Sequence, residues 1–120
     1  MKILVVEDDP ASRELLLYYL HSEGYQVIVA EDGQEGFDKA QQEKPELVVT
    51  DLSMPRMDGV ELIRLLRQRP DLKGVKICVL TAHGSGNIEK ARTAGADAVM
   101  QKPTPPDTLA DVVRQLTGGS

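Results

Sequence analysis

The sequence predicts an α/β fold in which a parallel sheet lies between two layers of helices. Two observations lead to this prediction. Unbroken apolar runs rich in β-branched residues, such as 3–6 and 77–80, are typical of strands that are covered on both faces. Between such runs lie segments with helical spacing, about ten residues long, which suit crossover helices between parallel strands. The order strand then helix therefore repeats five times.

The first strand is expected at 3–6, where four apolar residues follow one another. Three carboxylates and Pro10 come next, and proline is tolerated in the first turn of a helix because its missing N–H would have no partner there. Asp9 is therefore expected to cap a helix over 11–23, which Gly24 ends. Capping explains one of the three acids and leaves two without a structural role.

The remaining elements continue this alternation. The run 25–30 alternates only weakly, which suits a strand at the edge of the sheet, and Asp32 and Gly33 then turn the chain. Gly36 is expected to weaken the next helix by about 0.5–1 kcal/mol relative to alanine. The further strands are predicted at 47–50, 76–81 and 98–101, and the further helices at 34–43, from 60 to the break at 69–70, at 88–94 and at 107–116.

Length and composition predict one globular domain. The chain has 120 residues, of which 41% are hydrophobic and 28% charged. We expect the domain to span 1–117, with 118–120 as a tail or the start of a linker. The formal net charge of -5 and the absence of a Lys/Arg cluster argue against direct binding to nucleic acid. Cys78, the single cysteine, allows no internal disulfide, and its apolar neighbours favour an inert core thiol.

The chain shows no signal for a membrane. No apolar run approaches the ~20 residues of a membrane-spanning helix, and the first apolar run is far shorter than that of a signal peptide. A single cysteine also suits a reducing compartment. We therefore expect a cytoplasmic protein without membrane contact.

Polar residues stand where four of the predicted strands end. Because the carboxyl ends of parallel strands share one edge of the sheet, five side chains are expected to meet there: Glu7, Asp8, Asp51, Thr81 and Lys102. Each has a structural explanation when taken singly. Asp51 could cap the following turn, Thr81 could bond to the backbone, and Lys102 could be solvated. Together, three carboxylates facing one lysine and one hydroxyl indicate a site.

The chemistry of these groups suits transfer of a phosphoryl group. Carboxylates at one point repel each other, so without a cation at least one is expected to have a raised pKa. Mg²⁺ relieves that repulsion, and it prefers one or two carboxylates together with water and phosphate oxygens. Lys102 would supply a second positive charge, and Asp51 would act as a nucleophile that forms an aspartyl-phosphate.

The sequence closely resembles the receiver domain of two-component response regulators over essentially its whole length. The resemblance rests on ILVVEDDP at 3–10, DLSMPRMDG at 51–59, LTA at 80–82, GADA at 95–98 and KP at 102–103. It implies a flavodoxin-like, doubly wound (βα)5 fold with the strand order 2-1-3-4-5. The spacing of the elements alone does not give that order.

The resemblance also implies a role for each acidic residue. Asp51 is expected to be the phosphoacceptor, and Glu7 with Asp8 the acidic pair that binds Mg²⁺. Asp8 would ligate the ion directly, Glu7 through water, and Ser53 would add its backbone carbonyl. Thr81 is expected to bond a phosphoryl oxygen.

Lys102 is expected to pair with the phosphoryl group, and the peptide bond from Lys102 to Pro103 is expected to be cis. The chain departs from the family pattern at Val99, where receiver domains usually carry a tyrosine or phenylalanine that rotates inward with the threonine. A β-branched valine cannot swing a ring between exposed and buried positions. Gly84 and Gly86 suggest that the loop after the fourth strand carries more of the change, and His83 in that loop could line the site or be exposed. His21 is expected on a helix surface.

The function implied is a phosphorylation-controlled switch. A histidine kinase or histidine phosphotransfer protein would donate the phosphoryl group, and an effector protein would bind the fourth helix, fifth strand and fifth helix. Beyond self-phosphorylation from small donors and autodephosphorylation, no enzymatic activity is expected. No output domain follows in the sequence, so the chain reads either as a single-domain regulator or as a piece of a larger one.

Two alternatives remain. One is a protein-interaction module on the same fold, with atypical switching because of Val99. The other is a Mg²⁺-dependent phosphohydrolase that uses an aspartate nucleophile. Haloacid-dehalogenase-like enzymes place a second aspartate two residues after the nucleophile, where this chain has Ser53, which disfavours this reading.

Overall fold

The computed structural model describes residues 1–52, 57–81 and 88–118. Within them, five strands alternate with five helices. The strands are β1 (Lys2–Val6), β2 (Gln26–Ala30), β3 (Leu47–Thr50), β4 (Lys76–Thr81) and β5 (Ala98–Gln101). The helices are α1 (Pro10–Ser22), α2 (Gly33–Glu43), α3 (Gly59–Gln68), α4 (Ile88–Ala94) and α5 (Pro106–Thr117).

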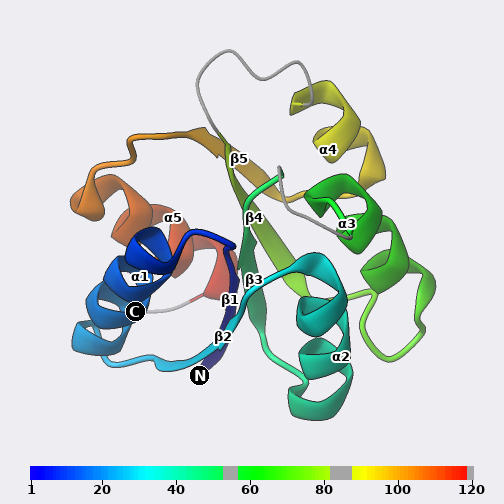
Figure 1. Cartoon of the computed structure of the whole chain (residues 1–120), viewed down its shortest axis with the longest axis horizontal. Helices are drawn as coiled ribbons and strands as arrows, with labels where there is room; N and C mark the ends of the chain where they lie inside the picture. The colour runs from blue at the N-terminus through cyan, green and yellow to red at the C-terminus, as the bar shows by residue number, and fades with distance from the viewer. Residues whose placement is uncertain (53–56, 82–87, 119–120) are drawn as a thin grey trace.

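All neighbouring strands pair in parallel, in the order β2-β1-β3-β4-β5. Figure 1 shows α1 and α5 on one face of this sheet and α2, α3 and α4 on the other. Both the doubly wound fold and the strand order are therefore confirmed. The weakly alternating strand β2 lies at an edge, as its pattern predicts; its first residue is exposed and the next three are half-buried.

The core consists of two clusters, one on each face of the sheet. Successive side chains of a strand point to opposite faces of the sheet. Because helices cover both faces, consecutive residues in the middle of the central strands are apolar. The cluster of the three-helix face comprises Leu4, Val6, Ala30, Ala40, Val48, Leu52, Met57, Val60, Leu62, Ile63, Leu66, Leu72, Val75, Ile77, Val79 and Ala91. The cluster of the two-helix face comprises Ile3, Val5, Leu20, Leu47, Val49, Cys78, Leu80, Leu109 and Val113.

Aspartates cap the first three helices. Asp9 accepts from Ser12 N at 3.0 Å, and Asp32 and Asp58 make the equivalent bonds at the starts of α2 and α3. The helices α1, α2, α3 and α5 each begin one residue earlier than predicted, because the residue after the cap already has helical backbone. None of the described helices is long and apolar enough to cross a membrane.

Gly36 permits a close approach between α2 and β1. A Cβ atom at this position would lie 2.8 Å from Val6 Cγ2. The expected loss of helix propensity at Gly36 thus accompanies a tighter contact with the sheet, beside the strand end that carries Glu7.

Arg67 joins three segments at the amino-terminal edge of the sheet. Its Nε and Nη2 donate to the carbonyl of Gly95 at 3.1 and 2.7 Å, and Nη2 also donates to Asp97 Oδ2 at 2.8 Å. Nη1 donates to the carbonyls of Lys73 and Val75. The end of α3, the connection into β4 and the turn between α4 and β5 are therefore held by one side chain.

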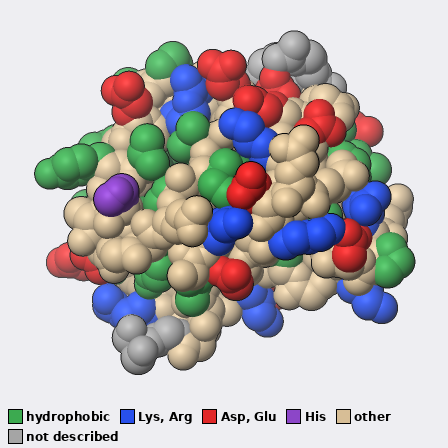
Figure 2. Space-filling model, turned by 90° about the horizontal axis from the view of Figure 1, so that it is seen from below, with side chains coloured by type: hydrophobic (Ala, Val, Ile, Leu, Met, Phe, Trp, Pro, Cys, Tyr) green, Lys and Arg blue, Asp and Glu red, His purple; other side chains and the backbone are tan. Residues whose placement is uncertain are grey.

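The outer surface carries both signs of charge. Figure 2 shows acidic and basic side chains interspersed over one face, with no broad basic area among the described residues of that face. This distribution agrees with the acidic net charge of the whole chain.

Candidate functional site

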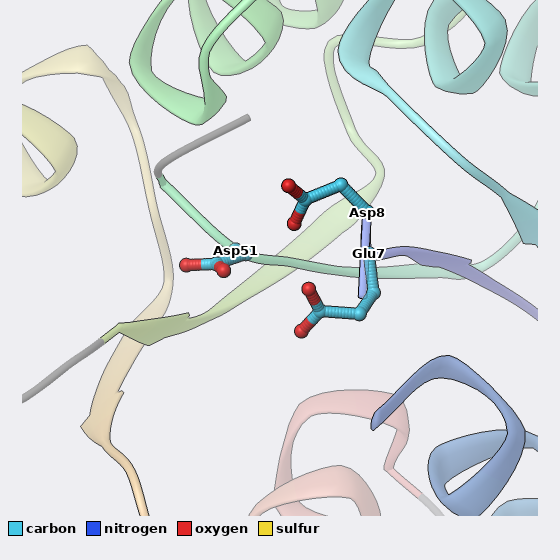
Figure 3. A group of neighbouring side chains, drawn as sticks. All are labelled: Glu7, Asp8 and Asp51. Carbon is cyan, nitrogen blue, oxygen red and sulfur yellow. The ribbon is translucent and has the colours of Figure 1, made fainter. Parts of the chain in front are cut away.

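Three carboxylates gather at the carboxyl ends of β1 and β3. Glu7 and Asp8 directly follow β1, and Asp51 directly follows β3. Each offers one oxygen, and these three oxygens all lie within 4.8 Å of one another. In Figure 3 the three side chains are directed toward one side of the strand ends. The convergence that the sequence predicted for these acids is thus present.

Strand register brings these residues together. Val6 stands opposite Thr50 in the β1–β3 pair, and Asp51 N donates to Val6 O at 3.2 Å. On the other side, Glu7 N donates to Ala30 O at 3.0 Å. The hydrogen-bond ladder therefore continues one residue past the strands, and it fixes the backbone from which Glu7 and Asp51 project.

Lys102 connects two of the carboxylates. Its Nζ lies 2.7 Å from Glu7 Oε1 and 3.3 Å from Asp51 Oδ2. Lys102 follows β5, its backbone N–H donates to Thr81 O at 2.8 Å, and its peptide bond to Pro103 is cis. The side chains of Glu7, Asp51 and Lys102 thus meet at one edge, although β5 lies two strands away from β3.

The pKa values of Glu7 and Lys102 are both raised, but for different reasons. Burial raises the pKa of Glu7, and hydrogen bonds from Lys102 and Asp9 N oppose the rise only in part, while the negative charge of Asp51 adds to it. Burial would lower the pKa of Lys102, but the neighbouring carboxylates outweigh it and the net change is upward. The predicted rise at one acid is confirmed, although burial contributes more to it than repulsion between carboxylates does.

The turn that carries Asp51 is tightly packed. Asp51 Oδ1 accepts from Leu52 N at 2.7 Å, and Gly59 N donates to Leu52 O at 2.9 Å. A Cβ atom on Gly59 would lie 2.3 Å from the Asp51 carbonyl oxygen. Only glycine fits at that position, because the start of α3 lies against the backbone of Asp51.

Thr81 and Val99 belong to the neighbouring strands. Thr81, the last residue of β4, is buried at 1% exposure and stands opposite Gln101. Val99 stands opposite Val79 and packs, partly buried, against the cluster of the three-helix face. Ser53 and the segment 82–87, which contains His83, Gly84 and Gly86, lie outside the described residues. His21 is exposed on α1, as predicted.

The sequence did not point to Arg13, which contacts the site from α1. Arg13 Nη1 donates to the Glu7 carbonyl oxygen at 2.9 Å, and Nη2 lies 3.5 Å from Glu31 Oε1. The one available signal was a basic residue within a turn of the acidic run 7–9. Nothing in hydrophobic periodicity marks a side chain that returns to a backbone carbonyl.

The donor set fits a hard divalent cation. Mg²⁺ takes oxygen ligands, with one or two carboxylates and several waters. Glu7, Asp8 and Asp51 supply oxygens from a buried, an exposed and a partly buried side chain, so the group is open to solvent at Asp8. A cation here would also offset the excess of three acids over one lysine.

The comparisons with known proteins show which family the chain is similar to. The family model described as "Response regulator receiver domain" matches residues 3–114. The response regulator MprA of Mycolicibacterium vanbaalenii is 42% identical over 117 residues, which cover 97% of this chain and 50% of MprA. The chain thus spans about half the length of that relative.

Two solved structures are similar over nearly their whole length. The chemotaxis response regulator CheY4 of Vibrio cholerae has a TM-score of 0.90 and 30% identity, with 96% of this chain and 97% of that chain covered. The receiver domain of the sensor histidine kinase PA1611 of Pseudomonas aeruginosa has a TM-score of 0.92 and 28% identity, with 98% of both chains covered. That structure holds a magnesium ion coordinated in its active site cleft. The chain therefore belongs to the receiver domain family of two-component response regulators.

Proposed function

We propose that the domain is a phosphorylation-controlled switch in which Asp51 accepts a phosphoryl group from a phosphohistidine. The donor would be a histidine kinase or a histidine phosphotransfer protein. The observation that supports this most is the meeting of Glu7, Asp8 and Asp51 with Lys102 at one sheet edge. Such a group can hold a cation and a nucleophile side by side.

In this reaction a carboxylate oxygen of Asp51 attacks phosphorus. The phosphorus–nitrogen bond breaks, and its electron pair stays on the leaving imidazole. Asp8, Asp51 and the Ser53 carbonyl would hold Mg²⁺ directly, and Glu7 would hold it through water. The ion supplies positive charge beside the phosphoryl oxygens.

Lys102 and Thr81 would bind the phosphoryl oxygens. Lys102 already faces Asp51 Oδ2, so its ammonium group is in place to neutralise charge on a group attached there. The Thr81 hydroxyl, at the end of the adjacent strand, would donate to a second oxygen. The same site would support phosphorylation from small donors and slow autodephosphorylation.

The output surface is proposed to be α4, β5 and α5, where an effector protein would bind. Val99 can change its side-chain rotamer, but it has no ring to move between exposed and buried positions. We assign residues 1–117 to the domain. We also propose that it acts in the cytoplasm. An interaction module with an inactive site stays the alternative, and Val99 is the observation that favours it.

The direct test is incubation with acetyl phosphate and Mg²⁺, followed by a phosphate-affinity gel. Wild type should give one retarded species, which EDTA prevents. Asp51→Asn should give none, because no nucleophilic oxygen remains at that position. Asp38→Asn, which changes an exposed acid on α2, serves as the matched control and should behave as wild type. Equal retardation of Asp51→Asn and wild type would disprove the assignment.

A further inference from the structure

Arg13 holds both ends of the acidic turn 7–9. Its backbone N–H donates to Asp9 O at 2.9 Å, the first hydrogen bond of α1. Its guanidinium Nη1 returns to the Glu7 carbonyl oxygen, also at 2.9 Å. The side chain is 15% exposed, which is low for an arginine on an outer helix. It lies against the turn and does not extend into solvent.

The remaining polar groups of Glu7 are held by other elements. Its backbone N–H donates to Ala30 O, and its carboxylate accepts from Lys102 Nζ and from Asp9 N. The carbonyl held by Arg13 belongs to the peptide that joins Glu7 to Asp8. Because a peptide is planar, the direction of that carbonyl fixes the orientation of the bond to Asp8 Cα. Arg13 therefore influences the direction of an exposed carboxylate that it does not touch.

The ion pair between Arg13 and Glu31 does not explain why the Arg13 side chain lies against the turn. The pair with Glu31 is 3.5 Å long, and the Glu31 side chain is 69% exposed. Exposed pairs of this kind contribute little to stability. The carbonyl of Glu7 is thus the contact with a structural consequence.

We infer that Arg13 is a positioning residue for the metal site, which it supports by orienting the peptide between Glu7 and Asp8. The inference rests on the proposed function, since it takes Asp8 as a ligand of Mg²⁺. Residues that orient a metal ligand from behind typically change metal affinity by about 10- to 100-fold when they are replaced.

The sign of the effect separates positioning from simple electrostatics. Removing a positive charge beside an acidic site would tighten the binding of any cation. Loss of positioning would weaken it instead. The loss should also be larger for Mg²⁺ than for Ca²⁺, because Mg²⁺ demands near-octahedral geometry while Ca²⁺ accepts irregular shells.

The experiment measures Mg²⁺ and Ca²⁺ affinity by calorimetry for wild type, Arg13→Met, Arg13→Lys and Glu31→Gln. Arg13→Met should bind Mg²⁺ about 10-fold more weakly, with a smaller loss for Ca²⁺. Arg13→Lys should recover part of the affinity, because an ammonium group can still donate to the Glu7 carbonyl. Glu31→Gln should match wild type, since it removes only the surface pair.

Unchanged or tighter Mg²⁺ binding by Arg13→Met would overturn the inference, as would equal losses for the two ions. Urea titrations check that each variant is folded, and Arg13→Lys keeps the test open if Arg13→Met is not. Wild type that binds no Mg²⁺ would instead contradict the proposed function. The two failures are therefore distinguishable.

Discussion

Helix α3 on the three-helix face buries more of its side chains than helix α1 on the two-helix face. In α3 four apolar residues are buried, at Val60, Leu62, Ile63 and Leu66. In the longer α1 only Leu20 is buried, while Leu15 is 68% and Tyr18 75% exposed. The apolar residues of α3 recur at helical spacing, whereas those of α1 form an unbroken run from 15 to 20 that circles the helix.

The two faces therefore contribute differently: one mainly to the stability of the fold, the other also to the acidic site. The cluster under α2, α3 and α4 supplies most of the buried apolar volume. The beginning of α1 instead supplies Asp9 and Arg13, which hold the acidic turn. A change deep in α3 should therefore affect unfolding first, and a change at the start of α1 should affect the site first.

The largest expected effect concerns the thiol of Cys78, which lies under the two-helix face. Burial raises the pKa of Cys78 from 9.0 to about 12, so the thiolate fraction near pH 8 falls by about 1000-fold relative to an unperturbed thiol. Labelling with a thiol reagent should be slower in native protein than in urea by at least that factor. Fast labelling of native protein would mean that α1 and α5 open locally and expose the thiol to solvent. The two-helix face would then differ from the three-helix face in local stability as well as in burial.

The next effect compares one leucine from each face. Leu62→Ala removes a fully buried side chain of α3 and should lower the free energy of unfolding by about 2–5 kcal/mol. Leu16→Ala truncates a half-buried side chain of α1 and should lower the free energy of unfolding by about 1 kcal/mol. Leu15→Ala should lower it by less than about 0.5 kcal/mol. Urea titrations give all three values. An equal cost for Leu62→Ala and Leu16→Ala would remove the distinction between the faces.

The smallest effect lies at an ion pair between Lys44, which follows α2, and Asp71, which follows α3. Hydrogen bonds from Lys44 and Arg69 lower the pKa of Asp71 from 3.8 to about 2. Because the folded pKa is below the unfolded one, the stabilisation is present above about pH 4 and is lost as the pH falls through about 2. Asp71→Asn should therefore lower the urea midpoint slightly at pH 6 and by less at pH 2.

Lys44→Gln removes one of the two partners of Asp71 and should show the same pH dependence. A difference between Asp71→Asn and wild type that is equal at both pH values would contradict this assignment. The effect is small because Asp71 lies at the surface and water screens the pair.

The sequence predicted every strand and helix to within about two residues, because buried parallel strands leave unbroken apolar runs and aspartates mark helix starts. It also predicted the meeting of Glu7, Asp51 and Lys102, which follows from parallel topology. The strand order came only from resemblance, since a crossover of a given length does not decide which strand becomes the neighbour. Arg13 was missed because a contact with a backbone carbonyl leaves no pattern in the sequence.

The contacts of Arg67 have a mechanical consequence for α4. This helix has only seven residues, Ile88–Ala94, and of these Ala91 alone is buried. Its carboxyl end is fastened through the Gly95 carbonyl to Arg67, which is itself bonded to Asp97. These bonds hold the carboxyl end of α4, and the chain reaches its amino end from β4 and Thr81. We therefore expect any reorientation of α4 to turn about its carboxyl end, which Arg67 holds.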